Sequence, residues 1–308
     1  MRELLKSNPQ KISLKSLSFL LLLSALGAWF YNVNVTHYSG NNYLPSHTWN
    51  IAAFLGLTYG GLRLYFPPLH ILRQYHQEIL RFFMVMVLIG FATNAVQYTP
   101  FSPIDQQIVQ FQQHYHLNMV QWMQWTYLHR EFRAILIRVY NTLPVQMVYL
   151  PLLVILVKRF DRIREYCFLL LISTIIGFMM YYFFPTTAPA SILSSAHFFP
   201  EQFATGIKFH EIHHHLKPST LQGGLIALPS FHVIWAWYIV YLLRDWPIAC
   251  GLLLPFNVLL VFACVLLGWH YPLDIFASII IILITHALLA LHCRGFRKLR
   301  IFSFPTFF

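Results

Sequence analysis

Residues 270–292 read HYPLDIFASIIIILITHALLALH, a polar start followed by an apolar run. The apolar part, 272–292, has the length of about 20 residues that an α-helix needs to cross the hydrocarbon core of a bilayer. His270 and Asp274 lie at its beginning, so a histidine and a carboxylate are predicted at the start of a membrane-spanning helix. An ionisable pair in such a place favours a functional site, because charge is costly there.

Seven further apolar runs precede this one. Hydrophobic residues make up 57% of the 308 residues and charged residues only 10%, whereas soluble domains carry about 25% charged residues. In lipid, backbone polar groups must bond one another within helices, so we predict an all-α, polytopic membrane helical bundle of about six to eight transmembrane helices. The eight candidate spans are 16–33, 49–66, 79–98, 135–157, 165–184, 225–243, 248–267 and 272–292. Gly60, Gly61 and Arg63 make the second run the weakest of them.

Basic residues are distributed unevenly about these spans. If both termini are cytoplasmic, only five of the 21 Lys and Arg residues lie on the other side, the asymmetry of the positive-inside rule. Those five are Arg130, Arg133, Arg138, Lys208 and Lys217. This topology places the 185–227 segment outside, and it accounts for the net charge of +11 without a nucleic-acid partner.

The chain divides into two parts in this interpretation. Residues 1–134 hold N-terminal transmembrane helices and an interfacial amphipathic helix at about 104–129, where apolar residues recur at steps of three or four. Trp122 and Trp125 suit the headgroup zone of a membrane, although packing of this helix on the bundle explains the pattern equally well. Residues 135–300 form the catalytic transmembrane core.

Two short segments at the outer ends of spans carry the candidate catalytic groups. Pro272 suits the first turn of a helix, which places Asp274 one turn inside His270 on the same side. The carboxylate can accept the Nδ1 proton of His270 and leave Nε2 free to attack, as the aspartate of a hydrolase triad does. In the other segment, Pro229-Ser230-Phe231-His232, we expect His232 to be a general acid. The alternative is structural: Ser230 as an N-cap and His232 as a polar residue facing other helices.

The two segments together are similar to motifs of a known family. They resemble the second and third motifs of the type-2 phosphatidic acid phosphatase superfamily, Pro-Ser-Gly-His and Ser-Arg-(five residues)-His-(three residues)-Asp. The resemblance is closer to the branch of inositol phosphorylceramide and sphingomyelin synthases, whose third motif reads His-Tyr-x-x-Asp. Residues 182–189 likewise resemble the Phe-Pro-x-x-Pro stretch of inositol phosphorylceramide synthases. The resemblance covers about 165–292 and implies a core like that of these phosphatases.

The resemblance also implies a division of roles. His270 would be the nucleophile that forms a phospho-histidine, and Asp274 would orient it. His232 would act as acid and then as base, while Ser230 would bind a phosphate oxygen. No cofactor or metal is implied. The other expected substrate-binding residues are Thr186, Thr187, Lys208 and Lys217, with Arg130 and Arg133 as further sources of positive charge.

Departures from the family pattern bear on the substrate. The phosphatases' first motif, Lys-(six residues)-Arg-Pro, is absent, and Ala263 and Cys264 stand where the third motif has Ser-Arg. Cations that clamp a phosphomonoester dianion are therefore missing, which favours a phosphodiester with one charge less. We expect a lipid phosphatase or phosphotransferase at the outer leaflet. Transfer of a head group from a phospholipid or lipid-phosphate donor to a lipid alcohol is favoured over transfer to water.

A histidine-rich run, His210-Glu211-Ile212-His213-His214-His215, supports different expectations. It contains His-Glu-x-x-His, the zinc-protease pattern, and His-x-x-His-His, which occurs in membrane di-iron desaturases. A metal-dependent membrane oxygenase or protease is thus the alternative enzyme, although a run with four histidines matches such patterns easily. A lipid transporter is the non-enzymatic alternative, against which stands the lack of an inverted hydropathy repeat.

Overall fold

A computed structural model of the protein describes residues 13–38 and 41–301, with side chains of the last helix described to His292. Arg2, Lys6 and Lys11, which entered the charge argument, lie outside these residues. Within them, every regular element is a helix, which confirms the all-α fold. The elements are α1 (Leu14–Asn34), α2 (Thr48–Tyr65), α3 (Ile71–Ala95), α4 (Asp105–His114), α5 (Met119–Leu128), α6 (Arg130–Tyr140), α7 (Leu143–Leu156), α8 (Phe160–Phe183), η1 (Pro189–Ser191), α9 (Pro200–His213), α10 (Phe231–Leu242), α11 (Pro247–Leu266) and α12 (Pro272–Ile301).

Five of the described helices are long and apolar enough to cross a membrane: α1, α3, α8, α11 and the Pro272–His292 part of α12. The pair α6 and α7 is bent by 44° and makes a sixth if it counts as one span. A multi-pass membrane bundle is therefore confirmed, and the eight expected runs exceed this count at α2 and α10. The α2 helix contains Asn50 and Arg63 and lacks the necessary hydropathy, and α10 has only 12 residues, about 18 Å at 1.5 Å per residue.

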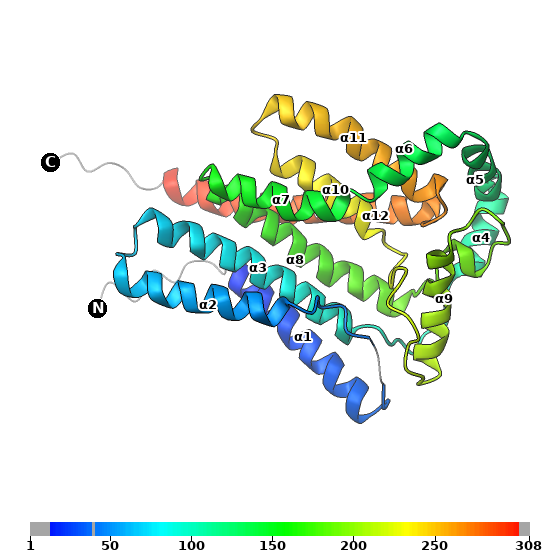
Figure 1. Ribbon diagram of the computed structural model, residues 1–308, viewed down its shortest axis with the longest axis horizontal. Coiled ribbons are helices and arrows are strands. Elements are labelled where there is room, and N and C mark those ends of the chain that lie inside the picture. Colours follow the sequence, from blue (N-terminus) through cyan, green and yellow to red (C-terminus); the bar gives the residue numbers. More distant parts are fainter. Residues whose placement is uncertain (1–12, 39–40, 302–308) are drawn as a thin grey trace.

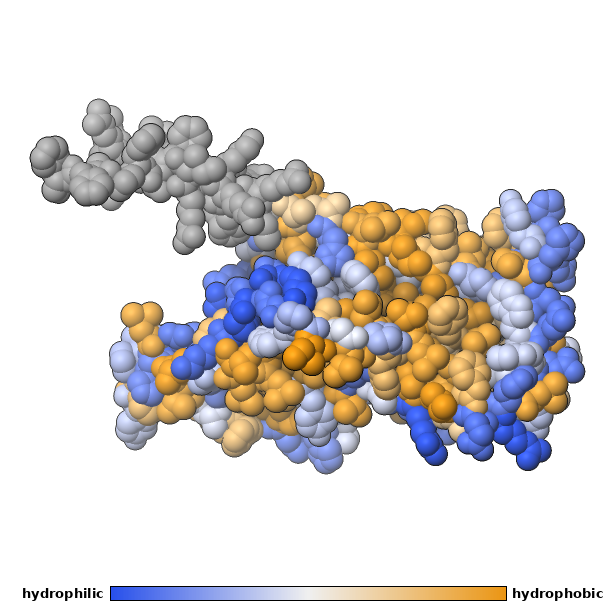
Figure 2. Space-filling view, turned by 90° about the horizontal axis from the view of Figure 1, so that it is seen from above, coloured by the Kyte–Doolittle hydropathy of each residue, from blue (hydrophilic) through white to orange (hydrophobic). Residues whose placement is uncertain are grey.

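Helix α8 lies in the middle of the bundle and packs against α1, α3, α7, α10 and α12 (Figure 1). All nine residues from Tyr166 to Thr174 are buried, as expected of a helix that is apolar on every side. Outer helices instead expose apolar side chains, among them Leu64 and Leu252. Apolar residues cover much of the middle of the molecule in Figure 2, and hydrophilic residues gather at the end that holds α4, α5 and α9.

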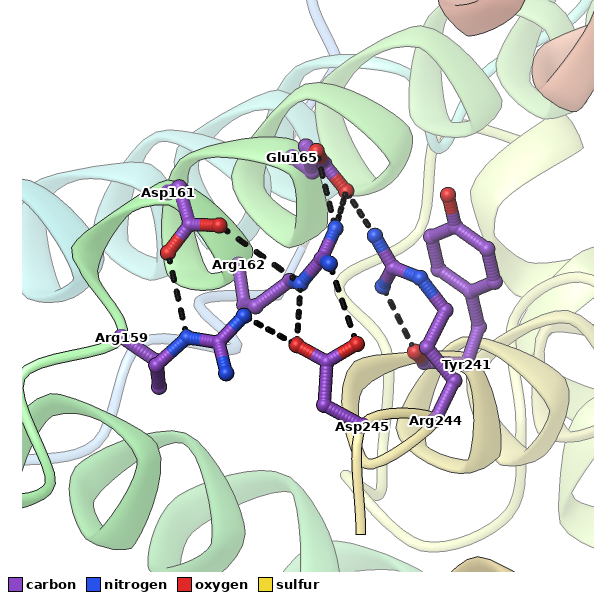
Figure 3. A network of polar contacts seen from close by, with 7 residues as sticks. All are labelled: Arg159, Asp161, Arg162, Glu165, Tyr241, Arg244 and Asp245. Carbon is purple, nitrogen blue, oxygen red and sulfur yellow. Dashed lines mark hydrogen bonds and ion pairs between the residues drawn. The ribbon is translucent and has the colours of Figure 1, made fainter. Parts of the chain in front are cut away.

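The opposite end, where α8 begins, is held by an ion-pair network (Figure 3). The Arg162 guanidinium donates to both carboxylate oxygens of Asp245, over 2.7 and 3.0 Å. Arg159 also donates to Asp245, and Arg244 donates to Glu165. Arg162 holds the pKa of the Asp245 carboxyl below its usual range. The network thus ties the turn between α10 and α11 to the start of α8.

Two segments outside the spans differ from their expected form. The stretch expected as one amphipathic helix is divided into α4 and α5, with a left-handed residue, His116, at φ +56° in the break. Ile108 and Met119 pack into a buried cluster with Tyr271, so this region lies on the bundle near the start of α12. The long 185–227 segment contains α9, whose inner face meets the same end of the bundle.

Candidate active site

A cavity of about 350 Å³ lies at the end of the bundle that carries α9. Its walls come from the end of α6, from α9, from the 222–227 loop, from the start of α10 and from the turn before α12. Both His232 and His270 line it, and their ring centroids are 5.8 Å apart. Segments far apart in the sequence therefore bring the two predicted catalytic histidines to one cavity.

The turn that presents His270 follows from the end of α11. Gly268 has φ +86°, and a Cβ at this position would lie 2.6 Å from the methyl group of Met123. Glycine is the residue that adopts this conformation without strain. The backbone N–H groups of Trp269 and His270 both donate to the carbonyl of Cys264, over 3.0 and 2.9 Å. The turn thus fixes the backbone of His270 before α12 begins.

The imidazole of His270 is held through its Nδ1 atom. This atom lies 3.0 Å from the carbonyl oxygen of Ala227 and 3.3 Å from Oδ2 of Asp274. Both neighbours accept hydrogen bonds, so Nδ1 carries the proton and Nε2 keeps its lone pair. Burial lowers the pKa of His270 to about 4, which keeps the ring neutral. Such a ring can act as a nucleophile.

Asp274 lies in the first turn of α12, as its spacing predicted, and is fully buried. Its Oδ2 also accepts the backbone N–H of Tyr271 over 2.8 Å, so one carboxylate oxygen bonds both residues of the turn. This arrangement resembles the acidic half of a capping box, in which a third-position carboxylate accepts the N–H of the cap residue. Asp274 therefore orients the turn as well as the imidazole.

His232 is oriented by stacked aromatic rings. The ring of Tyr140 lies 4.5 Å from that of His232 at 18°, and Trp269 stacks on Tyr140 at 5.3 Å and 7°. Phe199 continues the stack on Trp269, and the Arg133 guanidinium lies 4.7 Å from the centroid of Phe199. The stack thus fixes the plane of the His232 ring on the cavity wall.

Comparison with known protein families gives a match for this part of the chain. A family model described as the PAP2 superfamily matches residues 106–288, more than half of the sequence. The chain belongs to the PAP2 superfamily. Comparison with curated proteins and with solved structures gave no match. Membership supports phosphatase-type chemistry on lipid phosphates in a membrane setting. The match begins at the first turn of α4, well before the part of the chain in which the resemblance was evident.

Three residues expected to bind substrate in this PAP2 chain instead make hydrogen bonds outside the cavity lining. Ser230 is fully buried, and its N–H donates to the Ser278 hydroxyl over 2.9 Å, which joins the start of α10 to α12. The Thr186 hydroxyl accepts the N–H of Leu228 over 3.0 Å. The N–H of Thr187 donates to Asp105 over 2.8 Å. None of the three lines the cavity.

The expected cations of this PAP2 chain are also directed elsewhere. Lys208 is fully buried on α9, and its ammonium donates to Gly223 O over 3.1 Å and to the Tyr43 hydroxyl over 3.2 Å. Burial lowers the pKa of Lys208 to about 8. Lys217 and Arg130 are exposed. No Lys or Arg is among the residues found to line the cavity.

Several residues of the cavity wall were missed by sequence analysis. On α9 they are Glu201, Gln202 and Thr205, and elsewhere Tyr140 and Trp269. Gln202 also has a structural role. Its side-chain amide donates to Leu267 O over 2.9 Å, and its side-chain oxygen accepts the N–H of Phe199. The periodic positions 201, 202 and 205 are those that share one face of a helix. Sequence analysis did not single out this helix, because no apolar run of span length marks it.

The histidine-rich run forms the last turn of α9 and the residues after it. Nδ1 of His213 and of His214 each lie within hydrogen-bond distance of a backbone carbonyl of the preceding turn, at 2.6 and 2.8 Å. Glu211 accepts the N–H of Ser219 over 2.9 Å. Among the residues that the structure describes, no three His, Cys, Asp or Glu side chains converge as metal ligands.

We expect the histidine run to be dispensable for turnover. Changing His213, His214 and His215 together to Gln should leave kcat within about threefold, because none of them lines the cavity with His232 and His270. Turnover before and after treatment with EDTA is the measurement. A large loss in the variant, with stoichiometric zinc or iron in the parent protein, would favour the metalloenzyme.

Proposed function

We propose that the protein is a lipid phosphotransferase that works through a phospho-histidine on His270. Its donor is a phospholipid, and its acceptor is the hydroxyl of a second lipid in preference to water. The observation that carries this proposal is the pair His232 and His270 on one cavity wall, with Nδ1 of His270 bonded and Nε2 left to react.

The reaction has two steps of the same kind. In the first, the Nε2 lone pair of His270 attacks phosphorus, an N–P bond forms, and the P–O bond to the leaving group breaks. His232 must enter this step protonated, and it gives its proton to the leaving oxygen and becomes neutral. In the second step, His232 takes the proton of the acceptor hydroxyl, which attacks phosphorus and releases His270. Asp274 and the Ala227 carbonyl hold the Nδ1 proton throughout.

The charge of the cavity supports a phosphodiester donor. Its wall has two histidines and one carboxylate, Glu201, and no Lys or Arg among the residues found to line it. A phosphomonoester dianion gains little in such surroundings, whereas a phosphodiester carries a single negative charge. Lys208 stabilises the cavity wall indirectly, because its ammonium donates a hydrogen bond to the carbonyl oxygen of Gly223, a lining residue. The Thr186 hydroxyl accepts the N–H of Leu228, and the N–H of Thr187 donates to Asp105, so both residues stabilise segments next to the wall.

The sequence pattern suggests which acceptors to test first. The His-Tyr-x-x-Asp pattern at 270–274 is that of sphingolipid synthases, so a ceramide is the first candidate acceptor, with diacylglycerol as the comparison. Purified protein should be incubated with phospholipids of different head groups together with each alcohol, and the products resolved by mass. We expect the head-group phosphate to appear on the acceptor. Release of free phosphate from phosphatidic acid, without any transferred product, would make the protein a hydrolase instead.

We propose further that the cavity opens on the extracytoplasmic side, with both termini cytoplasmic. The matched variants Lys217→Cys and Lys158→Cys test this, since both lysines are exposed, and Lys158 lies just before α8 whereas Lys217 lies between α9 and α10. In a background with Cys250 and Cys293 changed to Ser, a membrane-impermeant thiol reagent added to intact cells should label position 217 and not 158. The reverse pattern would place the cavity on the cytoplasmic side.

A further inference from the structure

A buried carboxylate outside the site residues, Asp105, is bonded to the catalytic turn. It is the first residue of α4 and is only 1% exposed. Its carboxylate accepts hydrogen bonds from two neutral groups, the Thr187 N–H and the Tyr271 hydroxyl. Burial raises its pKa. Burial of a carboxylate is costly, and the hydrogen bonds it accepts offset part of that cost.

The two donors to Asp105 come from two segments that are far apart in the sequence, and each is next to a residue that lines the cavity. The Tyr271 hydroxyl donates to Oδ1 over 3.0 Å, and the Thr187 N–H donates to Oδ2 over 2.8 Å. Tyr271 follows His270, and Thr187 precedes Ala188, both of which line the cavity. The start of α4 is also joined to this region by a bond from Ile104 N–H to Pro185 O over 2.9 Å. One carboxylate thus joins the two segments.

Tyr271 connects Asp105 to the catalytic aspartate. Its side chain is fully buried in the cluster with Ile108 and Met119, and its backbone N–H donates to the same Asp274 oxygen that faces His270. A shift of Tyr271 therefore moves the peptide that joins it to His270 and changes the bond to Asp274. Catalytic geometry tolerates little displacement of this kind.

We propose that Asp105 is a positioning residue: through Tyr271 it holds the His270 turn and Asp274 in register with the segment of Thr187 and Ala188, which also contributes to the cavity lining. This rests on the proposed function, in which His270 is the nucleophile. Asp105 makes no contact with the reacting atoms, so it acts on the rate of the chemical step rather than on substrate binding.

The test compares Asp105→Asn, Tyr271→Phe and the double variant. Each single change should lower kcat by about tenfold or more and leave KM within about twofold. Because the two residues share one hydrogen bond, the double variant should lose no more than about twice the larger single loss. Tyr238→Phe is the matched control, since it removes one buried hydroxyl bond, to Thr285 over 2.7 Å, on the α10–α12 contact. It should lower thermal stability and leave kcat within about twofold.

The outcomes separate this inference from the function on which it rests. If His270→Ala abolishes turnover while Asp105→Asn and Tyr271→Phe keep kcat, the positioning role is wrong and the phospho-histidine stands. Equal losses of kcat in Tyr238→Phe, or multiplying losses in the double variant, would also overturn it. If His270→Ala keeps its activity, or the parent protein transfers no phosphate, the proposed function fails and the inference fails with it. If Asp105→Asn does not fold, Tyr271→Phe alone decides the question, because it removes the same hydrogen bond.

Discussion

Replacing His270 by Ala is expected to lower turnover by a factor on the order of 10⁴ or more. The substitution removes the only proposed nucleophile, and the covalent route has no substitute because the remaining histidine of the cavity, His232, is placed as the acid. Folding should survive, since among the described residues the imidazole makes hydrogen bonds only to Ala227 and Asp274. The Asp274 oxygen also keeps its bond to the N–H of Tyr271.

Turnover of a labelled phospholipid measures the loss, and chemical trapping identifies its cause. A phospho-histidine is labile in acid and stable in base, so the parent protein should retain label after alkaline quenching and the variant should not. The control is His286→Ala, a change on the same helix at a ring that accepts a hydrogen bond from Trp237 over 2.9 Å. More than about 1% residual turnover in His270→Ala would rule out a phospho-histidine at this position.

Asp274→Asn is expected to lower turnover by a factor on the order of 10²–10³. The corresponding change in a hydrolase triad costs about 10⁴, largely because the histidine adopts the wrong tautomer. Here the Ala227 carbonyl also accepts the Nδ1 proton, over 3.0 Å, and so preserves the tautomer in part. What remains lost is the negative charge that stabilises the ring when phosphorus becomes bonded to it.

The matched control for this change is Asp245→Asn in the ion-pair network at the other end of α8 (Figure 3). It removes a carboxylate from two arginines and should lower thermal stability while turnover stays within about twofold. Steady-state kcat of both variants and their unfolding temperatures in detergent decide the matter. A loss below about tenfold in Asp274→Asn, or a comparable loss in Asp245→Asn, would reduce Asp274 to a helix-capping residue.

The fold class and the central pair of the site were accessible from the sequence because both depend on local regularities. A run of about 20 apolar residues forms a helix in lipid whatever its neighbours are, and Pro272 with Asp274 fixes where α12 begins. The two short segments with His232 and His270 were found in the same way. Of the eight expected runs, α2 and α10 fall outside the count of long apolar helices, because α2 is too polar and α10 too short.

The rest of the site depends on packing between segments that are distant in the chain. The Ala227 carbonyl is 43 residues from His270 in the sequence, and Asp105 is 166 residues from Tyr271. Contacts between residues so far apart produce no periodic pattern from which they could be predicted. Lys208 was expected at the phosphate, but the direction of a side chain on α9 depends on which face of that helix meets the bundle. The sequence by itself determined a helical membrane protein with a His–Asp pair at a helix start, because helix formation and spacing along one helix are local. Only the tertiary structure decided which groups surround the pair, because backbone carbonyls, stacked rings and buried carboxylates reach the cavity from helices whose mutual placement is set by packing.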